Sequence, residues 1–140
     1  MTTPSIVYTD AGRSEDREPI LQGLIAYNRS NAPDPKFQML GLLLKDETGA
    51  TIGGLWGRSA YEWLFVELLF VPESLRGTGL GTTLMQQAEQ VARDRRCTGV
   101  WLDTFAFQAL PFYRKLGYTV FGELKDHPRG ISQYWLQKRV

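Results

Sequence analysis

Apolar and polar residues follow two different periods along the chain, and these periods predict which segments are helices and which are strands. Helical spacing of apolar residues predicts helices over residues 19–29, 80–94 and 109–116. Pro19 and Pro111 suit a first helical turn, and Gly117 suits the residue that ends a helix. In the second helix Leu80, Leu84 and Ala88 trace the apolar face, and we expect Glu89 to lie away from it.

Short apolar runs between turn residues predict the strands. They cover residues 5–9, 37–45, 51–59, 64–71, 98–104, 118–123 and 131–139. Glycines in the 51–59 run indicate a bulge or a close approach by another backbone. The helix at 80–94 makes the strands on either side of it parallel. The predicted fold is a mixed α/β (α+β) domain spanning residues 1–140. Its central sheet is mostly antiparallel with one parallel βαβ unit, and helices flank it.

Composition narrows the class of protein without indicating a function. The chain has 140 residues, 43% of them apolar and 22% charged, as in an ordinary globular domain. Its net charge of +1 gives no electrostatic basis for a nucleic-acid or membrane partner. The chain has a single cysteine, Cys97, and its first residues lack the basic and apolar regions of a signal peptide. Both features indicate a cytoplasmic protein. A homodimer is left open as an assembly.

The chemistry of the chain is concentrated after the apolar run at 64–71. Pro72 ends that run, and Arg76-Gly77-Thr78-Gly79-Leu80-Gly81 then leads into the helix at 80–94. Glycines let backbone N–H groups approach a ligand closely, and a helix start adds unpaired donors and a positive dipole end. The segment therefore predicts an anion site, most simply for phosphate.

Spacing separates three families with such a loop. A Walker loop is excluded because no lysine lies between Lys45 and Lys115. A dinucleotide loop fits poorly because its third glycine is missing, but Asp103 at the end of the next strand keeps a nucleotide-binding or methyltransferase function open. The third pattern, Arg-x-x-Gly-x-Gly, is met by Arg76, Gly79 and Gly81, and it resembles the pyrophosphate loop of the GNAT superfamily of N-acetyltransferases.

A second motif strengthens this resemblance. Ala109-Leu-Pro-Phe-Tyr113-Arg-Lys-Leu-Gly117-Tyr is similar to the Ala-x-x-x-Tyr-x-x-x-Gly-Phe/Tyr helix of the superfamily. The two motifs occur in the expected order and together cover residues 66–123. One departure is Ala106, because many members carry an asparagine at that position. A cofactor contact through that amide is therefore not expected here.

The resemblance implies acetyl-CoA as co-substrate, bound in a splay between the strands at 64–71 and 98–104. Its pantetheine arm would pair with the backbone of Leu69 and Val71, and its pyrophosphate would bind N–H groups from Arg76 to Thr82. The implied cofactor-binding residues are Leu69, Phe70, Val71, Arg76, Gly77, Thr78, Gly79, Leu80, Gly81, Thr82 and Phe112. An amine would attack the thioester directly, with the N–H of Leu69 as oxyanion donor.

Two proton transfers need side chains, and the resemblance implies one candidate for each. Glu67, the one acid within the apolar strand, is the candidate base, and a structural carboxylate paired with arginine is its alternative role. Tyr113 is the candidate acid, protonated at neutral pH because a free phenol has a pKa of about 10. Core packing is the alternative role for Tyr113.

Other reactive residue types have simpler explanations. We expect His127 on the surface and Cys97 buried and inert. We expect Asp103 to cap or hydrogen-bond the next segment rather than to contact substrate. Trp56, Tyr61 and Trp63 could wall an acceptor pocket, and no residue cluster has metal-ligand spacing. The acceptor amine is left open, and a non-catalytic acyl-CoA-binding sensor or assembly domain is the alternative function.

Overall fold

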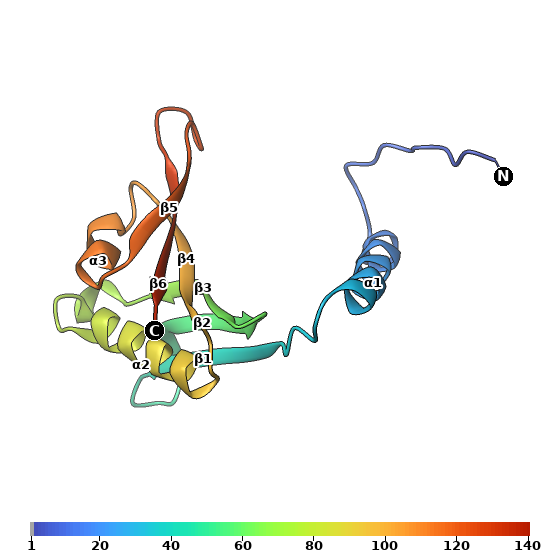
Figure 1. The fold of residues 1–140 in the computed structure, drawn as a ribbon. Coiled ribbons are helices and arrows are strands. Elements are labelled where there is room, and N and C mark those ends of the chain that lie inside the picture. Colours follow the sequence, from blue (N-terminus) through green and yellow to red (C-terminus); the bar gives the residue numbers. More distant parts are fainter. Residues whose placement is uncertain (1) are drawn as a thin grey trace. The chain divides into compact units, whose positions relative to one another are not determined.

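The structure is a computed structural model, which describes residues 2–140 and divides into two compact units, residues 1–34 and 35–140 (Figure 1). In the first unit a single helix, α1 (Ser14–Asn31), follows a segment without regular structure. The strand predicted at residues 5–9 is wrong, and Ile6, Val7 and Tyr8 are fully or largely exposed there. A strand needs a neighbour for its backbone N–H and C=O groups, and the described part of this unit contains none.

Helix α1 begins five residues earlier than predicted. The Asp16 carboxylate accepts a hydrogen bond from the Arg13 N–H at 3.2 Å, which satisfies a donor at the helix start. Pro19 consequently lies inside the helix rather than at its first position. No residue of α1 is buried within the described chain.

The second unit is built around a six-stranded sheet. Its strands are β1 (Gln38–Lys45), β2 (Thr51–Ala60), β3 (Trp63–Phe70), β4 (Gly99–Phe105), β5 (Thr119–Leu124) and β6 (Gln133–Arg139). They lie in the order β1-β2-β3-β4-β6-β5, and only β3 and β4 are parallel. Helices α2 (Leu80–Asp94) and α3 (Leu110–Lys115) and a short 3-10 turn, η1 (Glu73–Leu75), complete the unit. The predicted mixed, mostly antiparallel sheet with one parallel βαβ unit is confirmed.

The core lies between the sheet and α2. Met85, Ala88 and Ala92 on this helix are fully buried, as are Leu64 and Val100 on the strands. The prediction for Glu89 is wrong, because this residue is only 5% exposed. Its carboxylate accepts hydrogen bonds from the Tyr118 hydroxyl and the Lys138 ammonium, both at 2.9 Å. Burial of the charge is tolerated because both carboxylate oxygens have a partner.

Strand β3 contains an irregularity that matters for the site. Trp56 and Gly57 of β2 are opposite Leu68 and Val66, so Glu67 is an extra residue without a partner in β2. Parallel pairing with β4 extends from Trp63 only as far as Val66. Beyond that point β3 pairs with β2 alone, and the edge that faces β4 is unpaired. The sheet therefore forks at the bulge.

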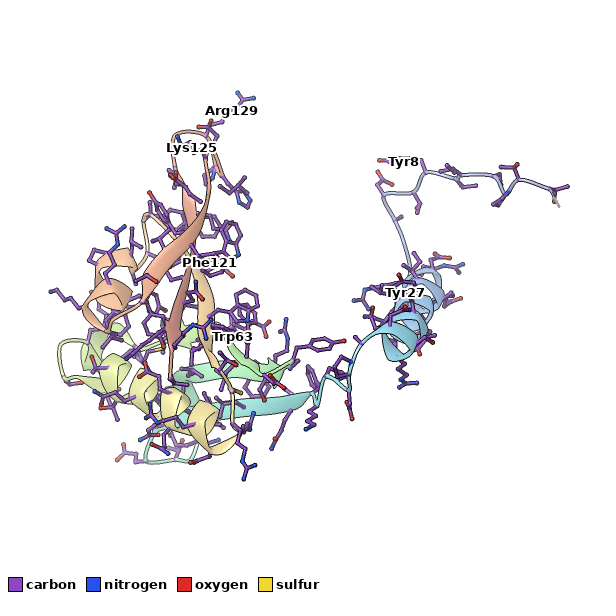
Figure 2. The ribbon with its side chains drawn as sticks, in the orientation of Figure 1. Tyr8, Tyr27, Trp63, Phe121, Lys125 and Arg129 are labelled. Atoms are coloured by element: carbon purple, nitrogen blue, oxygen red, sulfur yellow. The ribbon has the colours of Figure 1, made fainter. Side chains whose placement is uncertain are left out.

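The far end of the unit is the hairpin of β5 and β6, whose loop carries Lys125 and Arg129 at its tip (Figure 2). Phe121 on β5 is 53% exposed and has no partner in β6, because Val120 and Gly122 are opposite consecutive residues there. Among residues 2–140, no helix is long and apolar enough to cross a lipid bilayer.

Candidate active site

A cavity of approximately 510 Å³ opens where β3 ends, α2 begins and α3 passes. It is lined by Leu69, Phe70, Val71, Leu75, Arg76, Gly77, Gly79, Leu80, Gly81, Thr82, Ala109, Phe112 and Tyr113. The sequence placed eleven of these residues in the site, counting the candidate acid Tyr113, and did not identify Leu75 and Ala109. The cavity thus brings together residues 69–82 and residues 109–113, which are far apart in the sequence.

The glycine loop is shaped by two left-handed backbone positions. Gly77 has a φ of 77° and Gly79 a φ of 87°, a region that side-chain-bearing residues seldom adopt. A Cβ atom at either position would meet nothing within 4 Å, so the backbone conformation, rather than space within the protein, calls for glycine. Gly81 differs, because a Cβ there would lie 3.3 Å from the Phe112 ring.

Backbone donors are available at the start of α2. The N–H of Thr83 makes the first bond of this helix, donating to the Gly79 carbonyl at 3.0 Å. The N–H groups of Leu80, Gly81 and Thr82 precede it and have no carbonyl within the helix to bind. Together with the helix dipole they make the cavity attractive to an anion.

Arg76 and Thr78 stabilise the loop from within. Arg76 Nε donates to the Val71 carbonyl at 2.9 Å, and its guanidinium lies 5.7 Å from the centre of the Phe70 ring. The Thr78 hydroxyl donates to the Leu75 carbonyl at 2.6 Å. Thr78, predicted to bind cofactor, does not line the cavity through its side chain.

Tyr113 lies in the cavity wall, only 7% exposed. Its ring makes edge contacts with Phe112 and Tyr118, at 5.1 and 6.1 Å between ring centres. Burial, together with the nearby negative charge of Asp103, raises the pKa of the Tyr113 phenol to about 12. The hydroxyl is therefore protonated at neutral pH and able to donate.

Glu67 occupies the bulge at the fork and does not line the cavity. Its carboxylate lies 3.5 Å from the Arg58 guanidinium, and the two side chains are 46% and 42% exposed. The alternative role given to Glu67, a carboxylate paired with an arginine, is thus present in the geometry. Both side chains remain accessible to water, so the pair is weak.

Asp103 is the first residue of β4 that no longer pairs with β3, although it still pairs with β6. Gln133 Nε2 donates to its Oδ1 at 3.0 Å, and Gln133 Oε1 lies 2.7 Å from His127 Nδ1. Asp103 therefore has a structural hydrogen bond, but its partner is Gln133 of β6 and not the segment that follows β4. His127 is exposed as predicted, yet it also has this partner.

Two other candidates are clarified by the fold. Cys97 is buried, and burial raises the pKa of its thiol. The suggested acceptor wall of Trp56, Tyr61 and Trp63 stays a prediction, and its members lie at different points along β2, the following turn and β3. Trp56 pairs with Leu68 near one end of β3, whereas Trp63 begins that strand and lies 5.8 Å from the Arg139 guanidinium. Tyr61 lies in the turn between β2 and β3.

Known proteins resemble this chain over most of its length. A sequence model described as the acetyltransferase (GNAT) family matches residues 8–118. An acetyltransferase of Agrobacterium fabrum is 36% identical over 135 residues, which are 96% of this chain and 98% of that protein. A solved acetyltransferase structure from Agrobacterium tumefaciens, also 36% identical, superimposes with a TM-score of 0.93 over 98% of this chain and 100% of its own.

A third relative is the blasticidin-S acetyltransferase of Streptomyces morookaense, 40% identical over 67% of this chain and 70% of that protein. The family match spans the glycine loop and the Tyr113 helix, and it excludes the nucleotide-binding and methyltransferase alternative. The chain therefore belongs to the GNAT family and is an N-acetyltransferase that uses acetyl-CoA as its co-substrate.

Proposed function

We propose that the protein transfers the acetyl group of acetyl-CoA directly to a primary amine. The observation that carries this proposal is the cavity that joins the glycine loop to Tyr113. An anion-binding loop at one end and a protonated phenol at the other suit a ligand with a pyrophosphate and a thioester. The fork at Val66 gives the acceptor a way to reach the thioester from the β4 side.

The reaction forms a C–N bond between the amine and the acetyl carbon and breaks the C–S bond of the thioester. The neutral amine nitrogen attacks the acetyl carbon, and a tetrahedral intermediate carries negative charge on the former carbonyl oxygen. The N–H of Leu69, on the part of β3 that pairs with β2 but no longer with β4, is the proposed donor to that oxygen. The intermediate collapses with loss of the CoA thiolate, and the amide nitrogen releases its proton.

Tyr113 is the proposed acid for the departing thiolate. Its pKa of about 12 lies above that of a typical thiol, about 8.5. A phenol with this pKa is a weak acid, so its contribution depends on position rather than on acidity. The support for this role is the burial of Tyr113 in the cavity wall, with ring contacts on two sides.

Glu67 is the proposed base for the acceptor ammonium. It lies at the bulge where the fork opens, and its exposed carboxylate can take a proton directly or through a water molecule. In this role Glu67 would take the proton of the acceptor ammonium at the fork and then release it to solvent.

We propose a small-molecule amine as the acceptor. The support is the 40% identity to a protein named for acetylation of blasticidin S. The test is a panel of amines that contains blasticidin S, spermidine, tryptamine and a lysine peptide, with acetyl-CoA in excess. Free thiol release and the mass of the acetylated product are measured together.

Release of CoA with formation of an amide on one or more small amines is the expected result. Acetylation of the lysine peptide alone would show that the acceptor is a protein amine and not a small molecule. Tight acetyl-CoA binding without release for any amine would instead favour the sensor or assembly function.

A further inference from the structure

Asp103 occupies the β4 side of the fork. Leu102, its neighbour, is the last β4 residue paired with β3, and it is buried toward α2. Successive residues of a strand point to opposite faces, so Asp103 points to the face away from α2, as does Trp101. The cavity for acetyl-CoA contains the start of α2 and Tyr113. Asp103 therefore lies across the fork from the cofactor, on the side open to the acceptor.

The carboxylate of Asp103 is held in one orientation. Gln133, which is 8% exposed, donates from Nε2 to Asp103 Oδ1, while its Oε1 is engaged by His127 Nδ1. The His127 ring in turn lies edge-on to Phe105, with 5.4 Å between ring centres. An amide engaged at both ends cannot rotate freely, so it fixes Oδ1. Within residues 2–140, Asp103 Oδ2 has no hydrogen-bond partner.

This carboxylate is within electrostatic reach of the reacting centre. Asp103 is the charged group that adds to burial in raising the pKa of Tyr113. Tyr113 is the proposed acid for the thioester sulfur, so the charge of Asp103 acts on a side chain that would meet the reacting group. An amine held at Oδ2 would be presented to the acetyl group from the β4 side of the fork.

Two stacked aromatic rings lie on the same face of the sheet as the carboxylate. Trp101, two residues before Asp103, stacks on Phe65 of β3 with 4.1 Å between ring centres. The Arg58 guanidinium lies 4.8 Å above the Phe65 ring while it pairs with Glu67. This face thus already accommodates a cation between an aromatic ring and a carboxylate.

We propose that Asp103 binds the ammonium group of the acceptor through Oδ2, with Gln133 as its positioning residue. The enzyme would then select amines that are protonated and carried on a flat apolar group, bound beside Phe65 and Trp101. This inference rests on the proposed amine acetyltransferase function and names the residue that recognises its acceptor. Glu67, on the opposite side of the fork, would receive the proton of the bound ammonium.

The test compares tryptamine, a cation at neutral pH, with tryptophol, in which a hydroxyl replaces the amine. Both probes are added to the enzyme saturated with CoA, and the melting temperature is followed at increasing probe concentration. We expect tryptamine to stabilise the wild-type complex more than tryptophol does. In Asp103→Asn this difference should vanish, because an amide cannot balance the charge of an ammonium.

Asp94→Asn is the matched control. Asp94, at the end of α2, also accepts one hydrogen bond from a glutamine Nε2, that of Gln90 at 2.9 Å. The tryptamine preference should persist in this variant. Gln133→Leu should weaken the preference without removing it, since the charge remains but its orientation is lost. Where tryptamine is acetylated, Asp103→Asn should raise its KM about tenfold or more and leave the KM for acetyl-CoA unchanged.

Equal stabilisation of the wild type by the two probes would overturn the proposal. So would a tryptamine preference that survives in Asp103→Asn. The binding measurement needs no turnover, so the two proposals fail in different ways. A cation preference that depends on Asp103, without acetyl transfer to any amine, would count against the proposed function alone.

Discussion

Val66 of β3 and Leu102 of β4 are the last paired residues of the two parallel strands. Both are buried toward α2, at 4% and 1% exposed, and they close the core below the fork. The next residue on each strand is an acid, Glu67 on β3 and Asp103 on β4. On both strands the last buried core residue is therefore followed directly by an acid of the candidate site.

Acetyl-CoA should raise the stability of the folded protein, because it binds the native cavity and not the unfolded chain. At a hundredfold excess over its dissociation constant the expected gain is about 2.7 kcal/mol. A thermal melt with acetyl-CoA measures this gain, with NAD, S-adenosylmethionine and ATP as comparisons. A larger shift with one of these three ligands would contradict the assignment of the cavity.

Gly79→Ala should destabilise the loop and weaken acetyl-CoA binding. The Cβ meets nothing within 4 Å, but a φ of 87° costs an alanine about 1–2 kcal/mol. Gly130→Ala is the matched control, with a φ of 79°, open space around its Cβ and a position in the distant β5–β6 loop. Both variants should lose similar stability in urea, and only Gly79→Ala should lose affinity in titration calorimetry. Equal affinities would show that Gly79 serves the turn alone.

Gly81→Val should act by a different route. Even the Cβ of a side chain at this position would lie 3.3 Å from the Phe112 ring, and the branches of valine would extend beyond it. They would also occupy the space that the pyrophosphate needs at the start of α2. We expect severe loss of acetyl-CoA binding with a folded circular dichroism spectrum. Normal binding in a folded Gly81→Val protein would contradict the anion-site interpretation.

Tyr113→Phe should lower kcat while acetyl-CoA affinity and stability change little. The ring contacts with Phe112 and Tyr118 remain, and only the proton donor is removed. A positioned acid contributes about 10²–10⁴-fold, and a phenol of pKa about 12 should contribute in the lower part of that range. Tyr118→Phe, which loses the bond to Glu89, is the control and should reduce stability more than kcat. Full activity in Tyr113→Phe would remove the acid role.

Glu67→Gln should slow acetyl transfer most at low pH. Without a carboxylate to take the proton, the reaction depends on amine that is already neutral, and that fraction grows as pH rises. Its rate should therefore recover partly between neutral and alkaline pH, whereas the Tyr113→Phe rate should not. Steady-state rates across this range of pH test the difference. Parallel profiles for the two variants would contradict the separate roles.

Glu89→Gln should lower the free energy of unfolding. The variant leaves the Lys138 ammonium facing a neutral amide, and breaking a buried ion pair costs about 3–5 kcal/mol. We expect the lower end of that range, because the Lys138 side chain is 31% exposed. Urea denaturation measures the loss, and Asp94→Asn on the exposed side of α2 should cost much less. Similar losses in both variants would show that the Glu89 pair adds little.

Much of the fold could be predicted because its signals are local. Every strand of the sheet lies within two residues of its predicted bounds, since alternating apolar runs and turn residues act over a few positions. The glycine loop and the Tyr113 helix were equally visible, because each motif is continuous in sequence. By contrast, residues 5–9 resemble a strand in composition, and no neighbouring strand exists in the described part of their unit to make them one.

The sequence by itself determined the elements, the order of the two motifs and thereby the family. Only the tertiary structure decided that Glu67 is a bulge residue paired with Arg58, that Glu89 is buried with Lys138, and that Asp103 is held by Gln133 at the fork. The reason is physical. Helical and strand periods depend on neighbours within a few residues, whereas charge pairing and strand separation depend on residues 9, 49 and 30 positions apart.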